Sequence, residues 1–351
     1  MSDEFYIKRC LELALLGMGH VSPNPMVGCV IVLNHKVIGE GYHQAYGKAH
    51  AEPNAVKAVF DRYGHEAEAM LKQATAYVSL EPCAHFGKTP PCADLFVKHQ
   101  IKKVVIGNRD PFSSVDGKGI EKLKNAGIEV LTGILEDECR YLNRRFFTRI
   151  QQQRPYIILK WAETANGYFA TKDGQQKWIT GALAKRLAHQ WRTEEDAILI
   201  GKQTAITDNP QLTAREWPGK NPIRLVIDKN LQVPLSNHIF NTEAKTIIFN
   251  EIKTDIIGHL QYIQMEDMQF YLAQKIAFQL YLMDIQSVMI EGGANILNQF
   301  LSSNLWDEAR IFSSSESWME GIPSPVINGN LKEQVQIGND KLSIYINNIN
   351  K

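Results

Sequence analysis

The feature that most constrains this chain is a set of metal-binding side chains spread over residues 50–52 and 82–92. His50, Cys83 and Cys92 offer one imidazole and two thiolates, a ligand set that suits Zn²⁺. Three protein ligands leave one position of a tetrahedral site open, as in catalytic zinc sites where a water molecule binds. The fold must therefore bring these three residues together, with Glu52 beside them.

Simpler interpretations exist for each part of this pattern. A lone His-x-Glu usually has no function, and two nearby cysteines form either a structural zinc site or a pair of buried thiols. A structural zinc takes four protein ligands, and no fourth stands at a matching spacing. The combination favours a catalytic zinc, with Glu52 moving a proton from water to a leaving group. His-x-Glu followed by Pro-Cys-x-x-Cys is the signature of zinc deaminases acting on bases, although here a longer loop separates Cys83 from Cys92.

Composition favours a small-molecule enzyme over a nucleic-acid-binding protein. Basic and acidic residues balance at 38 each, so the formal net charge is +0 and no basic surface for a phosphate backbone is indicated. No apolar run approaches the ~18 residues of a membrane span, and the acidic first residues are unlike a signal peptide. Cys10, Cys29 and Cys139 bring the cysteines to 5, and free thiols in an odd number predict the reducing cytoplasm.

The first half of the chain alternates predicted helices and strands. Apolar residues at helical spacing predict a helix over residues 7–18, ended by Gly17 and Gly19. Strands are predicted at 27–33 and 36–41, followed by a helix with His50 and Glu52 near its start. Strands at 76–80 and 103–107 flank a helix that carries Cys92. This alternation predicts an α/β layered domain.

A polar stretch at residues 151–155 ends in proline and predicts two domains, residues 1–150 and 151–351. Strands at 156–160, 197–201, 223–228, 246–249 and 287–290, with helices at 181–192 and 268–282, predict a second α/β domain, with Trp178 and Trp191 in its core. Glu291-Gly292-Gly293-Ala294 closes a strand and opens a helix, where backbone N–H groups can meet an anion. A plain tight turn is the alternative, and the run is not the Gly-x-Gly-x-x-Gly fingerprint.

Several of these runs together resemble the bifunctional deaminase/reductase family of riboflavin biosynthesis. In the first half they are residues 23–30, Gly41-Tyr42-His43, Gly47, and the segments 50–52 and 82–92. In the second half they are Lys160, Gly167, Trp178-Ile179-Thr180, Thr204, residues 208–213, Arg215 and the turn after Glu291. The resemblance covers almost the whole chain. It implies a cytidine-deaminase-like α/β/α domain followed by a dihydrofolate-reductase-like α/β domain, with one Zn²⁺ per chain and NADPH as cofactors.

In the first domain the resemblance implies substrate contacts by Asn24, His43, His85, Lys88 and Asp110. Each has an ordinary alternative: Asn24 can cap its loop, the histidines and the lysine can be solvated, and Asp110 before a proline can start a turn. Residues 112–114 depart from the more polar run that is common in the family, so the resemblance does not define this wall of the pocket.

In the second domain the resemblance implies that the cofactor contacts Ala162, Thr204, Asp208, Gly293, Ala294 and Asn295. It implies that the sugar phosphate contacts Gln176, Arg192, Leu212, Arg215 and Glu291, and Lys160, Asp208 and Glu291 are the candidates for polarising the sugar and moving protons. Arg192 also ends a predicted helix, where it can simply neutralise the helix dipole. Asn166 stands where the family commonly has Asp, and residues 163–165 are unusual before Gly167.

Together these features predict a cytoplasmic two-step enzyme. Its first domain deaminates 2,5-diamino-6-(5-phosphoribosylamino)pyrimidin-4-one, and its second reduces the ribosyl group of 5-amino-6-(5-phosphoribosylamino)uracil to ribityl with NADPH. We expect a homo-oligomer with a small-molecule substrate and no nucleic-acid or membrane partner. One alternative is a nucleic-acid or nucleoside base deaminase with an appended binding domain, which the neutral charge disfavours. The other is a zinc-stabilised binding module, which Glu52 and the missing fourth ligand disfavour.

Overall fold

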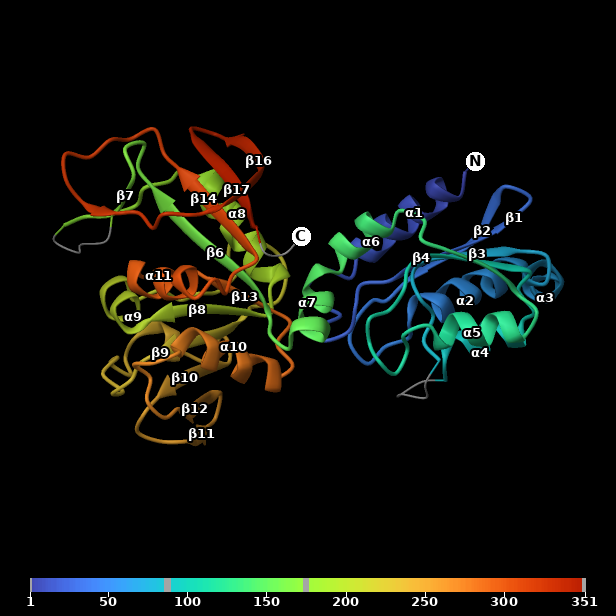
Figure 1. Cartoon of the computed structure of the whole chain (residues 1–351), viewed down its shortest axis with the longest axis horizontal. Helices are drawn as coiled ribbons and strands as arrows, with labels where there is room; N and C mark the ends of the chain where they lie inside the picture. Colours follow the sequence, from blue (N-terminus) through green and yellow to red (C-terminus); the bar gives the residue numbers. More distant parts are fainter. Residues whose placement is uncertain (1, 85–89, 173–176, 349–351) are drawn as a thin grey trace. The chain divides into compact units, whose positions relative to one another are not determined.

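The computed structural model describes residues 2–84, 90–172 and 177–348, and the chain divides into two compact units, Met1–Gln153 and Arg154–Lys351 (Figure 1). The boundary expected at residues 150/151 lies inside helix α7 (Arg144–Gln152), and the division follows the end of that helix. Gln153 has a φ of 52°, the left-handed conformation that commonly ends helices. Among the described residues, no helix has the length and apolar character needed to cross a membrane.

The first unit is built on a five-stranded sheet in the order β2-β1-β3-β4-β5. Its strands are β1 (Gly28–Leu33), β2 (Lys36–Tyr42), β3 (Thr75–Leu80), β4 (Lys103–Asn108) and β5 (Glu129–Thr132). β1 is antiparallel to both β2 and β3, whereas β3, β4 and β5 are parallel to one another. The carboxyl ends of β3 and β4 therefore lie at the same edge of the sheet, and Cys83 follows the first of them.

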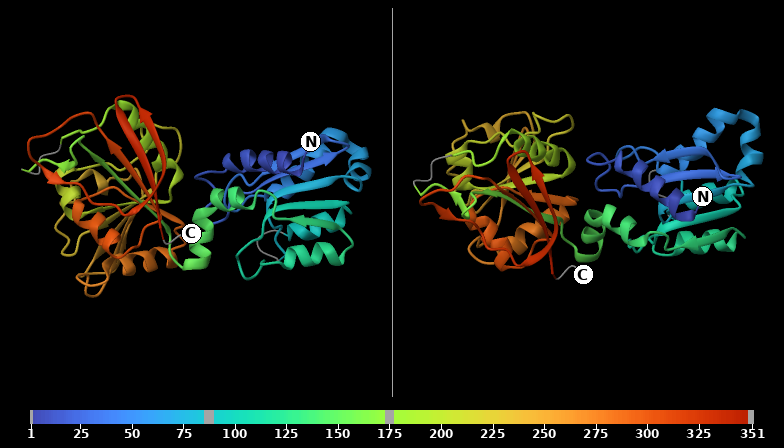
Figure 2. Two further views of the ribbon diagram at one scale, coloured as in Figure 1. Left: turned by 45° about the horizontal axis from the view of Figure 1, so that its top comes forward. Right: turned by 90° about the horizontal axis from the view of Figure 1, so that it is seen from above.

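Helices cover both faces of this sheet, which makes a three-layer α/β/α unit (Figures 1 and 2). One face carries α2 (Ala51–Tyr63), α3 (Ala67–Leu71), α4 (Cys92–Lys98) and α5 (Lys118–Asn125), and the other carries α1 (Asp3–Leu15) and α6 (Glu136–Leu142). The pleat of β1 divides its apolar side chains between the layers: Cys29 and Ile31 pack on the α2 side, Val30 and Val32 on the α1 side. α1 ends at Leu15, before the two glycines that were expected to end it.

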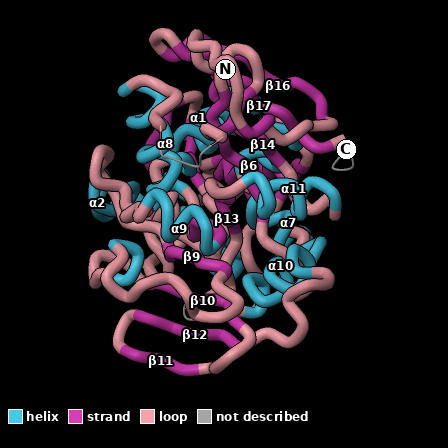
Figure 3. The backbone as a smooth tube through the Cα atoms, turned by 90° about the vertical axis from the view of Figure 1, so that its left-hand side faces the viewer, coloured by secondary structure: helices cyan, strands magenta, loops and turns pink. Residues whose placement is uncertain are grey.

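The second unit contains a ten-stranded sheet in the order β11-β12-β10-β9-β8-β13-β6-β14-β17-β16; Figure 3 shows the run from β9 through β10 and β12 to β11. Its strands are β6 (Tyr156–Glu163), β8 (Ala197–Gly201), β9 (Ile223–Ile227), β10 (Thr246–Asn250), β11 (Asp255–Ile257), β12 (Leu260–Gln264), β13 (Ser287–Ile290), β14 (Glu308–Ser313), β16 (Gly329–Ile337) and β17 (Asp340–Asn347). The strands from β12 to β14 are parallel, and only the two edges are antiparallel. A separate ribbon pairs β7 (Tyr168–Ala170) with β15 (Ile322–Pro323).

Two apolar layers enclose this sheet. α10 (Leu272–Leu282) and α11 (Ala294–Ser302) pack on one face, and α8 (Ala182–Glu194) and α9 (Lys202–Asp208) on the other. α10 begins four residues later than the predicted start at 268, since Tyr271 has a φ of 55° that a right-handed helix cannot contain. Because the strands are parallel, the carboxyl ends of β8 and β13 place Gly201 and Glu291 at one edge, level with Lys160 in β6. Ligands bind at this edge in open α/β sheets.

The tryptophan predictions had different outcomes. Trp191 is buried in the α8 layer, stacked on Phe312 with a centroid distance of 5.4 Å, as expected for a core residue. The core assignment of Trp178 is wrong, because its side chain is 62% exposed. It precedes α8 and meets solvent on one side, while the ammonium of Lys185 lies 5.3 Å from its ring centroid. The exposed Trp178 ring, with Lys185 beside it, is therefore available for contact with a ligand and is not part of the core.

The close packing of α2 on β2 depends on glycine. A Cβ atom on Gly41 would lie 2.4 Å from the Ala55 nitrogen and 2.5 Å from the Ala51 oxygen, and one on Gly39 would lie 2.5 Å from the Ala55 oxygen. These are backbone atoms of α2 and cannot rotate away. The two glycines therefore set the distance between the sheet and the helix that follows His50.

Gly41→Ala should push α2 off the sheet, destabilise the first unit by about 1–3 kcal/mol and weaken metal retention at His50. Circular dichroism melting and zinc content per chain would measure the two effects. Tryptophan fluorescence serves as an internal control, because all 6 tryptophans lie beyond residue 154 and report on the second unit alone. Gly181→Ala is the matched substitution, since its Cβ would make only an ordinary 3.5 Å contact. Equal stability of both variants and wild type would contradict the packing argument.

Candidate functional site

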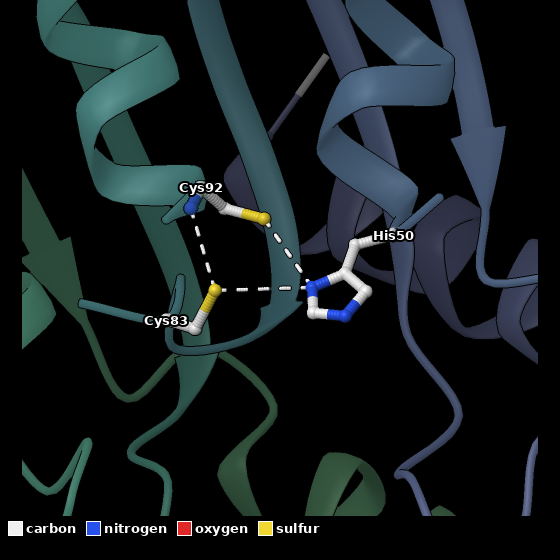
Figure 4. Close-up of side chains that lie close together, drawn as sticks. All are labelled: His50, Cys83 and Cys92. Carbon is white, nitrogen blue, oxygen red and sulfur yellow. Dashed lines mark hydrogen bonds between the residues drawn. The ribbon is translucent and has the colours of Figure 1, made fainter. Parts of the chain in front are cut away.

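Three separate elements deliver the predicted metal ligands to one place. His50 is the N-cap residue of α2, Cys83 follows β3, and Cys92 is the first residue of α4. The Nδ1 atom of His50 lies 3.4 Å from the Cys92 Sγ atom and 3.8 Å from the Cys83 Sγ atom, and all three donor atoms lie within 4.8 Å of one another. Figure 4 shows both sulfur atoms facing Nδ1.

These separations fit a tetrahedral zinc ion. Zn–S bonds of about 2.3 Å and Zn–N bonds of about 2.0–2.1 Å place a sulfur and a nitrogen about 3.6 Å apart at tetrahedral angles. The backbone N–H of Cys92 also donates to the Cys83 sulfur at 3.3 Å. A hydrogen bond from the Cys92 side chain, followed by one from His50, lowers the pKa of Cys83 and so favours the thiolate form that binds metal.

Glu52 lies one residue inside α2 and is only 3% exposed. Burial, followed by the nearby Cys83 charge, raises the pKa of Glu52 to about 7. A carboxyl group with that pKa can both accept and release a proton near neutrality. Since it belongs to the same turn of helix as His50, it stands beside the metal position without being one of the three clustered ligands.

Asn24 and His43 form a connected pair next to this centre. The Asn24 Nδ2 atom lies 3.1 Å from His43 Nε2, and His43 Nδ1 lies 3.1 Å from the Ala49 carbonyl oxygen. An amide donor on Nε2 leaves the proton of a neutral imidazole on Nδ1, and burial lowers the pKa of His43, which favours this neutral form. The His43 ring meets the His50 ring edge-on at a centroid distance of 5.2 Å.

A distant residue holds the loop that carries Asn24. Asn143, at the junction of α6 and α7, accepts from the Met26 N–H and donates to the Met26 carbonyl oxygen, both at 2.8 Å. Asn143 is 2% exposed, so this two-way hydrogen bond is shielded from water. The sequence analysis missed it, because a separation of 117 residues leaves no local signal.

Asp110 is the third predicted substrate residue within the described part of the first unit. It is buried, and its carboxylate accepts from the Phe112 N–H at 2.8 Å. Burial raises the pKa of Asp110 to about 7 despite that hydrogen bond. The remaining two predicted residues, His85 and Lys88, lie outside the described residues.

In the second unit, many of the predicted residues line one cavity of about 340 Å³. The cavity collects residues from four elements: Lys160 in β6, Arg192 in α8, Asp208 at the end of α9, and Leu212 and Arg215 in the segment that follows α9. The cavity also contains residues that the sequence analysis did not assign to a site: Trp178, Thr180, Lys185, His189 and His238. His189 lies three residues before Arg192, one helical turn away on the same face of α8, a spacing that sequence alone contains. Gln176 lies outside the described residues.

Arg192 and Glu291 form a bidentate ion pair. Arg192 Nη2 lies 2.7 Å from Glu291 Oε2 and Nε lies 3.2 Å from Oε1, while Nη1 donates to the Thr213 carbonyl oxygen at 3.1 Å. Burial alone would raise the pKa of Glu291, but the charges of Arg192 and Lys160 outweigh it and lower the pKa to about 2. Burial lowers the pKa of Lys160. Glu291 is therefore a permanent anion beside a lysine whose charged form is destabilised.

A second cavity of about 290 Å³ lies at the carboxyl ends of β8 and β9. It contains three predicted cofactor residues, Thr204, Gly293 and Asn295, and an apolar surface made by Ile227, Met268, Leu272 and Ile296. Lys202 and Lys229 also line it. Gly293 has a φ of 60°, and a Cβ on Gly292 would lie 3.0 Å from the Ile200 side chain and 3.1 Å from Thr204 Oγ1. The turn thus needs both glycines, and its donors and apolar surface fit a dinucleotide.

The other two predicted cofactor residues line neither of these cavities. Ala162 is partly buried and packs against the core layer on the α8 side, and Ala294 is the first residue of α11. Asn166, the departure from the family pattern, joins two loops: its Nδ2 donates to the Trp318 carbonyl oxygen at 2.7 Å, and its Oδ1 accepts from the Trp318 N–H at 3.1 Å. An aspartate has no donor for the first of these bonds.

Comparison with known proteins agrees with both sites. The cytidine and deoxycytidylate deaminase zinc-binding region matches residues 1–108, and the RibD C-terminal domain matches residues 155–315. These matches confirm the expected fold class of both units and the zinc-binding deaminase and reductase assignments.

Whole-length relatives share both units. The riboflavin biosynthesis protein RibD of Aquifex aeolicus (strain VF5) is 42% identical over 324 residues, which cover 91% of this chain and 89% of that protein. RibD of Escherichia coli (strain K12) is 34% identical over 339 residues, covering 89% and 87%. The structure of a diaminohydroxyphosphoribosylaminopyrimidine deaminase/5-amino-6-(5-phosphoribosylamino)uracil reductase from Thermotoga maritima matches with a TM-score of 0.89 at 34% identity, and Acinetobacter baumannii RibD with 0.88 at 32%, each over 98% of both chains. The chain belongs to the RibD family of bifunctional riboflavin-biosynthesis proteins.

Proposed function

We propose that the first unit deaminates 2,5-diamino-6-(5-phosphoribosylamino)pyrimidin-4-one and that the second unit reduces the resulting phosphoribosylaminouracil to its ribityl form. The observation that carries this proposal is the three-ligand cluster with a buried carboxyl group beside it. His50, Cys83 and Cys92 provide three ligands, and Glu52 stands next to them with a pKa near 7. A structural zinc site has no use for an open position or for such a carboxyl group.

In the deaminase unit, the bound zinc supplies a Lewis acid that lowers the pKa of a water molecule at the open position. Glu52 takes the proton of that water as its oxygen bonds to the ring carbon that bears the amino group. Glu52 passes that proton to the adjacent ring nitrogen. It then takes the remaining hydroxyl proton and gives it to the amino nitrogen, so that the C–N bond breaks and ammonia leaves as the carbonyl forms. Because burial raises the pKa of Glu52 to about 7, the same carboxyl group can accept and release a proton near neutral pH.

Substrate binding is assigned to Asn24, His43 and Asp110, with His85 and Lys88 as further predicted contacts. Asn24 and His43 hold each other through one hydrogen bond, so neither side chain has to be ordered when substrate binds. A raised pKa lets Asp110 carry a proton below about pH 7, so it can donate to a ring nitrogen or exocyclic oxygen.

In the reductase unit, NADPH supplies the hydride for the anomeric carbon of the sugar. We assign the accompanying proton to Lys160, because a lowered pKa makes its ammonium group a stronger acid. The proton goes to the ring oxygen, so the C–O bond breaks and the ribosyl group opens to ribityl. Glu291, an anion with a pKa of about 2, cannot donate a proton and is assigned to holding Arg192 and a sugar hydroxyl.

The cofactor is assigned to the 290 Å³ cavity and to Asp208, which lines the 340 Å³ cavity. Thr204, Gly293 and Asn295 offer polar groups, and the apolar surface is suited to a flat base. Lys202 and Lys229 give that cavity two cationic residues, which suits the extra phosphate that distinguishes NADPH from NADH. Leu212 and Arg215 are assigned, with Gln176, to the sugar phosphate.

Incubation with the diaminopyrimidine substrate, followed by mass spectrometry, tests both steps together. Without NADPH the product should be the deaminated aminouracil, and with NADPH it should be two hydrogens heavier. Deamination of RNA or free nucleosides with the diaminopyrimidine left unchanged would favour the base-deaminase alternative instead. Cytoplasmic location and a homo-oligomeric state stay predictions; sedimentation velocity tests the second.

Glu52→Gln should lower the rate of ammonia release by about 10²–10⁴-fold, because only the proton transfers are lost. Zinc content should remain that of the wild type, since the three ligands are untouched. Reduction of the deaminated intermediate by the same preparation provides the internal control. Ammonia release at a near-normal rate would remove Glu52 from the mechanism.

Arg192 and Arg215 should respond differently to alanine substitution, although the sequence suggested a phosphate clamp for both. Arg192→Ala leaves the buried Glu291 without its guanidinium partner, which should cost about 3–5 kcal/mol of stability and impair reduction of phosphorylated and dephosphorylated substrate alike. Arg215→Ala should lower kcat/KM roughly ten- to a hundredfold for the phosphorylated substrate only, the value of one charge-assisted contact. Tryptophan fluorescence melting and the two kcat/KM values decide the matter. Losses of kcat/KM confined to the phosphorylated substrate in both variants would support phosphate binding by both arginines.

Acid should destabilise the second unit through His189, which is 2% exposed. Burial, followed by the charges of Arg192 and Arg215, lowers its pKa from 6.5 to about 4, while Glu216 and Glu291 act in the opposite direction. Between these values the unfolded chain binds a proton that the folded chain does not, so stability is present above pH 6.5 and falls as pH drops towards 4. His189→Gln should remove this loss, which amounts to at most about 3 kcal/mol.

Tryptophan fluorescence melting of wild type and His189→Gln at about pH 7.5 and about pH 4.5 measures this effect. The wild type should lose more stability between the two conditions than the variant. Identical losses would show that the acid sensitivity of this unit lies in other groups.

A further inference from the structure

Glu81, which directly follows β3, makes a set of hydrogen bonds that the proposed mechanism does not use. Its carboxylate is 4% exposed and accepts from four backbone N–H groups. Oε2 accepts from Asp110 at 3.3 Å and from Gly117 at 3.0 Å, and Oε1 accepts from Gly119 at 3.0 Å and from Ile120 at 3.2 Å. All four donors belong to the segment between the end of β4 and the first turn of α5.

The backbone around these donors is shaped for this close approach. Gly117 has a φ of 83°, in the left-handed region that favours glycine. A Cβ on Gly119 would lie 2.0 Å from the Pro82 carbonyl oxygen and 3.2 Å from Glu81 Oε1. The segment therefore presses directly against residues 81 and 82, which immediately precede the metal ligand Cys83. The Glu81 N–H adds a further bond to the Asn108 carbonyl oxygen at 2.9 Å.

We infer that Glu81 is a positioning residue of the deaminase site, acting through Asp110. One buried carboxylate ties the turn that leads to Cys83 to the loop that begins at Asp110, and one of its four bonds is to the N–H of Asp110 itself. The inference rests on the proposed function, in which Asp110 contacts the substrate. It assigns Glu81 the task of holding that contact at a set distance from the metal ligands.

An ion pair within the same loop is, by contrast, exposed to solvent. Arg109 Nε lies 2.7 Å from Asp116 Oδ1, with both side chains about half exposed, at 58% and 49%. Such a surface pair contributes little to loop position. The four bonds to Glu81 are shielded and share one anionic acceptor, so removing it leaves several buried N–H groups without their partner.

Glu81→Gln is the decisive variant, because its amide keeps the size of the side chain but replaces an acceptor oxygen with a donor. We expect deaminase kcat/KM to fall about 10²-fold, as for a misplaced substrate contact. Zinc per chain and reduction of the deaminated aminouracil should be unchanged. In an Asp110→Asn background the same substitution should add less than about threefold, because the two residues act as one unit. Glu129→Gln, an exposed carboxylate on β5 paired with Lys103, is the matched control and should be neutral.

Amide hydrogen exchange measures the protection of the loop's backbone N–H groups without substrate. Exchange at Asp110, Gly117, Gly119 and Ile120 should be slow in the wild type and faster in Glu81→Gln; unchanged protection would overturn the inference even if activity fell. Equal losses from Glu81→Gln in the wild-type and Asp110→Asn backgrounds would also overturn it. Glu81→Asp keeps the charge but has a shorter side chain. It replaces Glu81→Gln in the comparison of the wild-type and Asp110→Asn backgrounds if the glutamine variant does not fold. A wild-type chain that releases no ammonia would instead refute the proposed function. Amide hydrogen exchange would still test whether Glu81 holds the Asp110 segment.

Discussion

The first unit depends on bringing two thiolates and an imidazole within 4.8 Å of one another in a largely buried place. Three elements from different parts of the sequence must end there: the start of α2, the end of β3 and the start of α4. Backbone hydrogen bonding along the sheet fixes β3, and the glycines of β2 fix α2, because any side chain at Gly41 would strike the helix backbone. The N–H of Cys92 then donates to Cys83, which joins the last two elements at the metal position itself. The packing that forms the fold of this unit therefore also brings the three metal ligands together.

The two units treat buried acids in opposite ways. In the deaminase unit, burial dominates at Glu52 and Asp110 and raises both pKa values to about 7, which suits groups that exchange or donate protons. In the reductase unit, Arg192 and Lys160 outweigh burial at Glu291 and lower its pKa to about 2, which suits a fixed anion. The difference lies in the neighbours rather than in the depth of burial: a carboxylate held by a guanidinium fork stays charged, and one without a cationic partner of comparable strength takes up a proton.

Loops in both units are held by side chains that do not belong to the proposed chemistry. Asn143 binds both backbone polar groups of Met26 next to Asn24, Glu81 collects four N–H groups of the Asp110 segment, and Asn166 bridges to both polar groups of Trp318. In each case a single side chain satisfies main-chain groups that would otherwise need water. Such contacts fix a loop without adding a functional group to the pocket, which leaves the pocket lining free to match its substrate.

The sequence by itself determined the local chemistry and the local structure. The spacing of His50, Glu52, Cys83 and Cys92 predicted the metal ligands and the proton carrier, and hydrophobic periodicity located most strands and the helices that carry these residues. Only the tertiary structure decided which side chains meet. Arg192 pairs with Glu291 across 99 residues, so the guanidinium expected to bind phosphate is already engaged. Trp178 is exposed beside a cavity instead of buried, and Glu81 and Asn143 act over long separations that no periodicity records. The physical reason is that propensity and pattern act within a few residues, whereas burial, ion pairing and pKa values depend on neighbours that only the folded chain supplies.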